Sequence, residues 1–489
     1  MNKKIQGIII GGVVVAALGG TLAILELTGK GPESSSAAGS SSQIVASVPD
    51  EDEDLSLIGV EKKEIKAISV TNATGGFELE RPASGKTEFN IKELTGLNLN
   101  STKLSGLVED VASLKAYKTV EKDAPDLAKY GLSQPETSFA VTFADGSIRT
   151  FDIGDVSAKK RYRYFCEHGK NTVYMVLTSS LNYMIDRKEE FVLLSLFGSQ
   201  TDESFGRLEI TRKDLDYTVA FENVEKDKEV ISSQVMVEPI FAHLNITTSG
   251  TVTHGLFGLA AGRCELVFPN EEQKKEYGLT EPLARVHYKN GDEEYALIIG
   301  NGRHATDSDG NEIDDIDSYY CMTEGMKGED CIWEIPATSV PWATFLPGDV
   351  ITMMTSNKIF DVSEVKVTAE GEVYDYTLEG SEADNKVYWA KKNGQDINVD
   401  LFKTLYKFLL SFPTKEIYFD KVEGEPFLTI EVTRTDMGGD KIEFYKDSSR
   451  RVIAAVNGKP SFRLQSRWTD TFIENLGRLD RGEELRENP

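Results

Sequence analysis

A serine and a lysine with catalytic spacing are the best nucleophile candidates in this chain of 489 residues. Ser157 and Lys160 form a Ser-x-x-Lys motif, in which the lysine can take the serine proton. The Ser-Asp-Asn and Lys-Thr-Gly motifs that accompany it in related serine enzymes are absent from the sequence. The motif also lies between two predicted strands and not on a helix. We therefore predict a solvated loop here.

Acidic residues are concentrated at residues 307–317, where they could coordinate calcium. An EF-hand loop requires acidic ligands at its first and twelfth positions and glycine at its sixth. With Gly310 at the sixth position, Ala305 and Ile316 occupy those two places, so the EF-hand interpretation fails. We favour an acidic hairpin insertion, and weak calcium binding in another geometry is the alternative.

No other residue pattern predicts catalysis, a metal or a cofactor. The histidines form no His-Glu-x-x-His motif or other close ligand pair: His168, His243, His254, His287 and His304. A Gly-x-Ser-x-Gly elbow and a Walker loop are also absent from the sequence. We predict no catalytic residue, no metal site and no cofactor.

Two cysteines flank a loop between predicted strands. Cys321 and Cys331 could face each other across the resulting hairpin. An oxidising compartment outside the cytoplasm permits a disulfide between them, and a pair of reduced thiols is the alternative. The sequence leaves this choice open.

Basic and aromatic residues alternate at residues 161–164, which read Arg-Tyr-Arg-Tyr. Alternation with period two is typical of a strand with two different faces. We predict an edge strand with one solvated face, and a ligand groove for glycan or peptide is the alternative.

The elements that would position these residues repeat along the chain. Residues 130–135 read Tyr-Gly-Leu-Ser-Gln-Pro, and residues 277–282 read Tyr-Gly-Leu-Thr-Glu-Pro, 147 positions later. A third segment keeps only the Glu-Pro pair, at residues 425–426. Such repetition predicts copies of one module. We expect Gly131 and Gly278 to have a positive φ, with the leucine that follows each glycine buried beneath the turn.

Each predicted module has the same order of elements. Paired strands with alternating apolar residues come first, as at residues 65–70 and 77–79. A helix follows, near residues 104–114, 240–244 and 401–412 in the three modules. The repeated turn comes next, and then hairpins marked by Asp-Gly and Asn-Gly pairs. The predicted fold class is α+β, with mainly antiparallel sheets.

Length and residue patterning divide the chain into five segments. Residues 1–29 contain two lysines followed by 19 uncharged residues, which predicts a transmembrane anchor with a cytoplasmic N-terminus. A cleaved signal peptide is the alternative. Residues 30–60 are rich in glycine, serine and acidic residues, so we expect a disordered tether. The three modules then occupy residues 61–200, 201–355 and 356–489.

The modules resemble the DUF4340 domain. The resemblance covers residues 61–350 and extends more weakly over residues 356–480. The matching residues lie in the turn, the hairpin that follows it and the last strands: Tyr130 to Pro135, Asp145-Gly146, Ile153-Gly154, Tyr162, Tyr164 and Val173-Tyr174, and again Tyr277 to Pro282, Ile299-Gly300, Tyr319-Tyr320 and Ile332-Trp333. The resemblance implies a membrane-anchored, exported protein without an assigned activity. By association alone, it also implies a link to gliding-type ABC transporter subunits.

Two functions of different classes remain open. The first is a single-pass membrane protein whose extracytoplasmic modules act as an accessory or scaffold, associated with ABC transporter subunits. The second is an exported surface module that binds a soluble ligand such as envelope glycan or peptide. A net charge of −26 argues against a nucleic-acid partner, which requires basic surfaces. Ligand, partner and oligomeric state cannot be inferred from the sequence.

Overall fold

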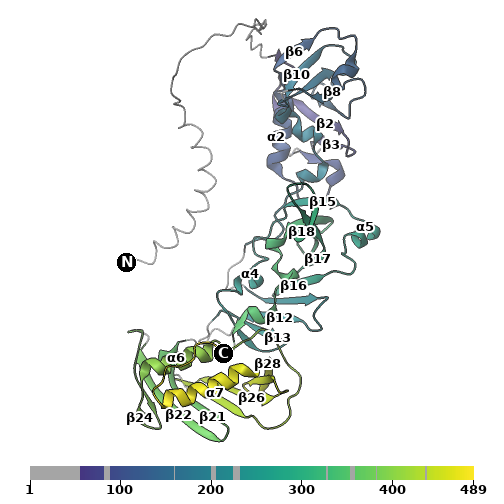
Figure 1. Ribbon diagram of the computed structural model, residues 1–489. Helices are drawn as coiled ribbons and strands as arrows, with labels where there is room; N and C mark the ends of the chain where they lie inside the picture. Colours follow the sequence, from purple (N-terminus) through teal and green to yellow (C-terminus); the bar gives the residue numbers. More distant parts are fainter. Residues whose placement is uncertain are drawn as a thin grey trace, which may run out of the picture. The chain divides into compact units, whose positions relative to one another are not determined.

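A computed structural model describes residues 55–81, 89–158, 160–199, 205–223, 232–326, 329–352, 358–381, 383–435 and 438–489 (Figure 1). The predicted anchor and most of the predicted tether lie outside these residues. Within the described ranges, no helix is both long enough and apolar enough to cross a membrane.

The described chain is mainly β, with some helices and three large antiparallel sheets. The predicted antiparallel sheets are confirmed, but the predicted α+β class overstated the helices. The helices are α2 (Ser101–Ala112), α3 (Asn182–Ile185), α4 (Gly250–Thr253), α5 (Glu271–Glu276), α6 (Val399–Leu410) and α7 (Ser466–Asp480). Among them, only α2, α6 and α7 are longer than two turns. The second module has no helix of that length among the described residues, because the segment predicted to form it is a strand.

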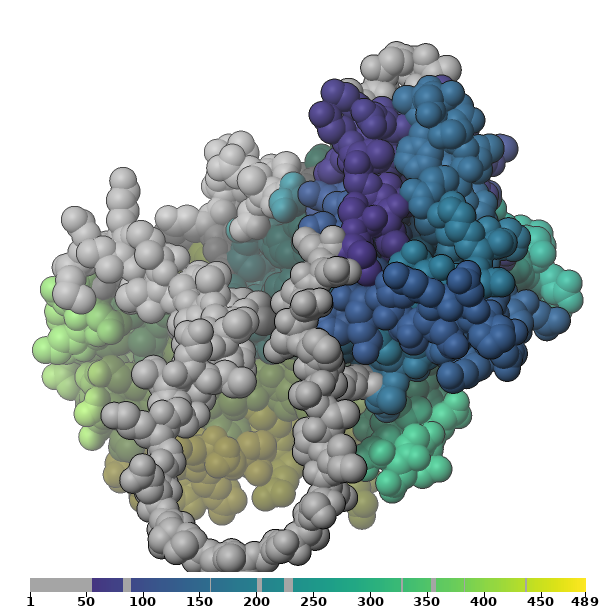
Figure 2. Space-filling view, turned by 90° about the horizontal axis from the view of Figure 1, so that it is seen from above, coloured from purple at the N-terminus to yellow at the C-terminus, as the bar shows by residue number. Residues whose placement is uncertain are grey.

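The first sheet has the strand order β4-β3-β2-β7-β8-β9-β10-β6. Its strands are β2 (Ile65–Thr71), β3 (Phe77–Glu80), β4 (Asn90–Ile91), β6 (Lys118–Glu121), β7 (Thr137–Phe143), β8 (Ile148–Val156), β9 (Tyr162–Glu167) and β10 (Val173–Leu177). Strand β2 pairs with β7, so segments far apart in the sequence lie side by side, as the purple and blue residues of Figure 2 show. Alternating burial along β7, from Thr137 to Phe143, confirms the predicted period of two.

The second sheet has the order β15-β19-β18-β17-β16-β11-β12-β13-β14-β20. Its strands are β11 (Arg207–Arg212), β12 (Val219–Asn223), β13 (Gln234–Glu238), β14 (Ala242–Leu244), β15 (Arg263–Val267), β16 (Ala284–Asn290), β17 (Glu293–Thr306), β18 (Glu312–Glu324), β19 (Cys331–Pro336) and β20 (Ile351–Thr352). The third sheet has the order β24-β23-β22-β21-β25-β26-β27-β28. Its strands are β21 (Val362–Ala369), β22 (Glu372–Ser381), β23 (Lys386–Lys392), β24 (Gln395–Asp396), β25 (Leu428–Arg434), β26 (Gly439–Lys446), β27 (Arg451–Val456) and β28 (Lys459–Gln465).

The three sheets share one strand order. In each sheet, one central strand (β2, β11 or β21) starts a hairpin on one side, and a later strand (β7, β16 or β25) returns to pair with its other side. Further hairpins then extend the sheet to β10, β19 or β28. In the first two sheets, a strand from the connection between the two central strands forms the outer edge. This strand is β6, which pairs with β10, or β15, which pairs with β19. In the third sheet an isolated bridge between Ile417 and Phe462 lies at the same place.

Helix α2 packs its apolar face against the core of the first sheet, and it lies alongside β2 and β3 (Figure 1). The spacing of Leu104, Leu107, Val108 and Val111 places them on one buried face, as predicted. The Asn100 side chain accepts a hydrogen bond from the backbone N–H of Lys103 and so caps the first turn. In the third module, α6 begins after Asn398 in the same way.

The helix predicted near residues 240–244 is wrong. Residues Ala242–Leu244 form strand β14, which pairs with β13 on one side and with β20 on the other. Residues 242, 243 and 244 are all buried, because this strand lies inside the sheet. Short runs of apolar residues fit a buried strand as well as a helix, which explains the error.

The predicted tether also extends too far. Leu55–Ser56 forms strand β1, which pairs with β5 (Lys115–Ala116). The Ile58 side chain is buried, and the backbone N–H of Val60 donates to the carbonyl of Ala112. Residues 55–60 are therefore part of the first module and not of a disordered tether.

Candidate functional site

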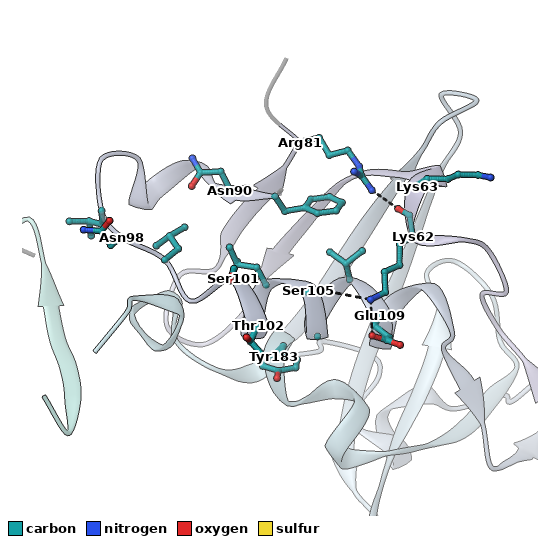
Figure 3. A pocket seen from close by; sticks show the side chains of 16 residues that line it. Lys62, Lys63, Arg81, Asn90, Asn98, Ser101, Thr102, Ser105, Glu109 and Tyr183 are labelled. Atoms are coloured by element: carbon teal, nitrogen blue, oxygen red, sulfur yellow. Dashed lines mark hydrogen bonds and ion pairs between the residues drawn. The ribbon is translucent and has the colours of Figure 1, made fainter. Parts of the chain in front are cut away.

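A groove along α2 is a candidate site, with a volume of about 1100 Å³ (Figure 3). It is lined by the exposed face of α2, by residues at the ends of β3 and β4, and by Tyr183 of α3. The hydroxyl side chains of Ser101, Thr102 and Ser105 lie along the helix side of the groove. Their spacing places them beside the buried face of α2, whose Leu104 and Val108 also line the groove.

An ion pair lies at one end of the groove. Lys62 Nζ is 2.7 Å from Glu109 Oε2 and 3.4 Å from Ser105 Oγ. A lysine in an ion pair with a carboxylate is a hydrogen-bond donor and not a base, so it does not activate the serine as a nucleophile. The ion pair instead joins the segment before β2 to the exposed face of α2, as the dashed lines in Figure 3 show.

Arg81 lines the groove on the side away from α2 (Figure 3). Its Nη2 donates to the carbonyl of Lys62 at 2.7 Å, and its Nε donates to the carbonyl of Ile65 at 3.1 Å. The guanidinium also lies 4.3 Å from the centre of the Phe89 ring, which is a cation–π distance. These contacts hold Phe89 beside the groove and provide an aromatic surface.

Besides charged side chains, the groove contains groups that suit a hydroxyl-rich or peptide-like ligand. Hydroxyl and amide groups line it together with the aromatic rings of Phe89 and Tyr183. Ligand sites typically combine apolar or aromatic walls with a few polar groups that fix orientation. Gly106 allows the Tyr183 ring to approach, because a Cβ at this position would lie 3.0 Å from the tyrosine hydroxyl.

The residues of this groove were not predicted from the sequence. The available signal was the hydroxyl face of α2, with Ser101 and Ser105 four residues apart. Arg81 and Phe89 give no such signal, because contacts between distant segments bring them to the groove.

The Ser157–Lys160 motif is not assembled for catalysis. It occupies the turn between β8 and β9, as the sequence analysis predicted. Ser157 is nevertheless buried, and its hydroxyl has no hydrogen-bond partner among the described residues. Lys160 is exposed, and its backbone N–H donates to the Ser157 carbonyl.

The acidic segment forms the tip of the β17–β18 hairpin, which confirms the predicted hairpin insertion. Asp307 accepts hydrogen bonds from the backbone N–H groups of Asp309 and Asn311. These bonds, together with one from the Asn311 side chain, lower the pKa of Asp307. Within the described ranges, no cluster of three or more His, Cys, Asp or Glu side chains is arranged to hold a metal ion.

Of the two alternatives left open for Cys321 and Cys331, the disulfide is wrong, because both are free thiols. Cys321 faces Trp333 on β19, and Cys331 lies two residues before Trp333 on that strand. Cys331 instead faces Val267 of β15. Its thiol shares a hydrogen bond with that of Cys264, and this bond and burial raise the pKa of Cys264. Each cysteine of the chain is a buried, free thiol.

The alternating residues 161–164 are also placed differently from the prediction. They run into β9, which is not an edge strand because it pairs with both β8 and β10. Tyr162 stacks on Tyr117 with ring centres 4.6 Å apart, and Arg163 donates to the carbonyl of Gly154. These residues therefore make packing contacts and hydrogen bonds within the first module.

The repeated turn has the same structure in the first two sheets. Gly131 has a φ of 69° and Gly278 a φ of 73°, and the leucine after each is buried, which confirms the prediction. A Cβ on Gly131 would lie 2.5 Å from Asp155 Oδ1, and one on Gly278 would lie 2.2 Å from Asn301 Oδ1. Glycine is needed at both positions for conformation and for space.

The tyrosine of each turn occupies an equivalent environment. Tyr130 packs edge-on against Tyr164, and its hydroxyl donates to Glu121 of β6. In the second sheet, Tyr277 packs edge-on against a tyrosine of β18, and its hydroxyl is 3.5 Å from a glutamate of β15. These contacts attach the edge strand to the turn, so this repeated tyrosine is structural.

Comparison with protein families identifies one match. Residues 90–248 match the domain of unknown function DUF4340. The match begins at β4 and ends just after β14, and it therefore includes α2 and the first repeated turn. Comparisons with curated proteins and with solved structures give no match. The resemblance noted beyond this range, over the second and third modules, remains a prediction. The chain thus carries a DUF4340 domain at residues 90–248.

Proposed function

We propose that this protein is a membrane-anchored, extracytoplasmic accessory or scaffold protein of a membrane complex, possessing three modules of common ancestry. The observation that carries the proposal is the strand order shared by the three sheets. Repetition of one unit enlarges an interaction surface, as in repeat proteins, whereas a single catalytic centre needs only one unit.

Several polar side chains make contacts within the modules, which supports a structural function. The repeated tyrosines attach edge strands, and the groove lysine is held by Glu109. The 19 uncharged residues near the N-terminus would anchor the chain, and the modules at residues 61–200, 201–355 and 356–489 would lie outside the cytoplasm. An ABC transporter of the gliding type is the proposed partner, on the basis of the family resemblance alone.

Topology provides the first test of this proposal. Protease added to intact protoplasts should degrade the modules and leave a small membrane-bound fragment, because residues from about 30 onward would be accessible. A cytoplasmic protein made in the same cells serves as the control for lysis. Survival of the full chain while added protease degrades a known surface protein would contradict the proposed localisation.

A second function is favoured by the groove along α2. We propose that it binds a neutral glycan or a peptide segment, because hydroxyl groups and two aromatic rings line it. Ser105→Trp would fill the groove from the exposed face of α2, and Lys407→Trp on the exposed face of α6 is a matched control. Binding of envelope glycan fragments or peptides that only Ser105→Trp abolishes would support this function. Equal binding by both variants would refute it.

A further inference from the structure

A pocket beside the third sheet is lined by four cationic side chains, although the chain has a net charge of −26. Its volume is about 340 Å³, which is enough for a small ligand. Among the side chains that line it, four are cationic, those of Lys415, Arg451, Arg463 and Arg467, and the Glu416 side chain is a carboxylate. Pro489, the last residue of the sequence, also lines the pocket. Like charges around one cavity repel one another, and a bound anion relieves that repulsion.

Two of the arginines are held in place by carboxylates. Glu416 forms ion pairs with Arg451 and with Arg463, and Arg463 Nε lies 3.3 Å from Asp447 Oδ2. Both guanidinium groups remain about one third exposed. Because an arginine carries five N–H donors, these ion pairs leave donors free for a further acceptor.

The other two cationic side chains are not neutralised. Lys415 and Arg467 are exposed, and neither has an ion-pair partner in the part of the chain that the structure describes. These two cations lie at one pocket together with Arg451 and Arg463, in a chain that is acidic as a whole. They supply the positive charge that Glu416 does not balance.

Helix α7 begins at the same pocket. Gln465 precedes its first residue, and Arg467 and Trp468 lie in its first turn. The Gln465 side chain does not cap the helix, and the backbone N–H of Ser466 donates to the carbonyl of Arg450 instead. The N-terminal end of a helix carries partial positive charge, which adds to the attraction for an anion.

We propose that this pocket binds the oxyanion of a small molecule, either a phosphate monoester or a carboxylate. Guanidinium groups match the planar, bidentate geometry of both oxyanions. Pro413, Leu464 and Trp468 provide an apolar wall for the rest of the ligand. This binding is independent of the scaffold function and of the groove along α2, because its residues all lie after residue 410.

Calorimetric titration of the full chain in detergent, with inorganic phosphate and separately with succinate, tests the proposal. Sodium chloride keeps the ionic strength constant. The double variant Lys415→Gln/Arg467→Gln removes the two unpaired charges, and Lys122→Gln/Lys275→Gln removes two exposed charges elsewhere. Circular dichroism verifies that both variants are folded.

The expected result is saturable binding of at least one anion and a Kd about tenfold higher or more in the first variant, equivalent to about 1.4 kcal/mol. The control should stay within about twofold of the native Kd. Tighter binding of phosphate or of succinate then identifies the preferred oxyanion. Absence of saturable binding by both anions, or equal binding by both variants, would overturn the proposal.

Discussion

Replacement of Gly131 by alanine should loosen the first module more than replacement of Gly146. Both glycines have a positive φ, at 69° and 85°. A Cβ on Gly131 would lie 2.5 Å from Asp155 Oδ1 and 2.9 Å from the Asp155 backbone nitrogen, whereas nothing lies within 4 Å of one on Gly146. The two variants therefore share the conformational cost, and only Gly131→Ala adds a steric conflict.

The expected magnitudes follow from these two terms. A non-glycine residue in the left-handed region costs about 1–2 kcal/mol, which should be the full effect of Gly146→Ala. Displacement of backbone at Asp155 should raise the cost of Gly131→Ala to about 2–3 kcal/mol. The second module offers a repeat of the experiment, because Gly278 has the same conformation and an equally close neighbour.

Hydrogen–deuterium exchange read by mass spectrometry is the suitable assay, because it reports stability locally in a chain with several sheets. Amides of β7 and β8 should exchange roughly 30- to 150-fold faster in Gly131→Ala, since 1.36 kcal/mol corresponds to tenfold. Gly198→Ala is the baseline, because no positive φ and no close contact restrict that position. Equal exchange in the Gly131 and Gly146 variants would refute the steric argument.

Three further predictions concern side chains of the first module. A hydrogen bond from Arg149 lowers the pKa of Glu167, so this pair should stabilise the fold above the unfolded pKa of about 4.3 and lose its effect as pH falls through the lower folded pKa. Arg149→Gln should therefore lower the melting temperature at pH 6 more than at pH 2, and an equal change at both pH values would contradict the linkage. Burial raises the pKa of Cys166 to about 12, so iodoacetamide at pH 8 should modify it at least about a hundredfold faster in urea than in the native protein, and comparable rates would show that the thiol is accessible. Tyr130→Phe removes the hydrogen bond to Glu121 and should speed amide exchange in β6 by an amount equivalent to about 1.5–3 kcal/mol, whereas unchanged exchange would show that the bond does not hold the edge strand.

Local sequence signals predicted the parts of the fold that depend on neighbouring residues. The Asp145-Gly146 turn joins β7 to β8, and Gly146 has the positive φ that such a turn needs. Helix α2 was predicted from the spacing of its leucines and valines. The positive φ in each repeated turn was predicted from the presence of glycine. In these cases the residue itself restricts the backbone.

Contacts between distant segments account for what the sequence did not predict. Strands β6 and β15 close sheet edges by pairing with strands more than 50 residues later in the chain, and their sequences carry no sign of that partner. The thiol contact between Cys264 and Cys331 depends on the pairing of β15 with β19, which explains why the sequence suggested only the nearer Cys321 as a possible neighbour of Cys331. The groove along α2 has the same origin, because Arg81 and Tyr183 reach it from separate elements.

Purification of the full chain from detergent-solubilised membranes, followed by mass spectrometry, tests the proposed function most directly. A variant that starts at residue 55 keeps the described modules and serves as the matched control. We expect the full chain to lie in the membrane fraction and to co-purify with integral membrane subunits in a constant ratio, and the shorter variant to leave the membrane fraction. Recovery of the full chain from the soluble fraction, or from membranes without any integral membrane partner, would contradict the proposal of a membrane-anchored accessory protein.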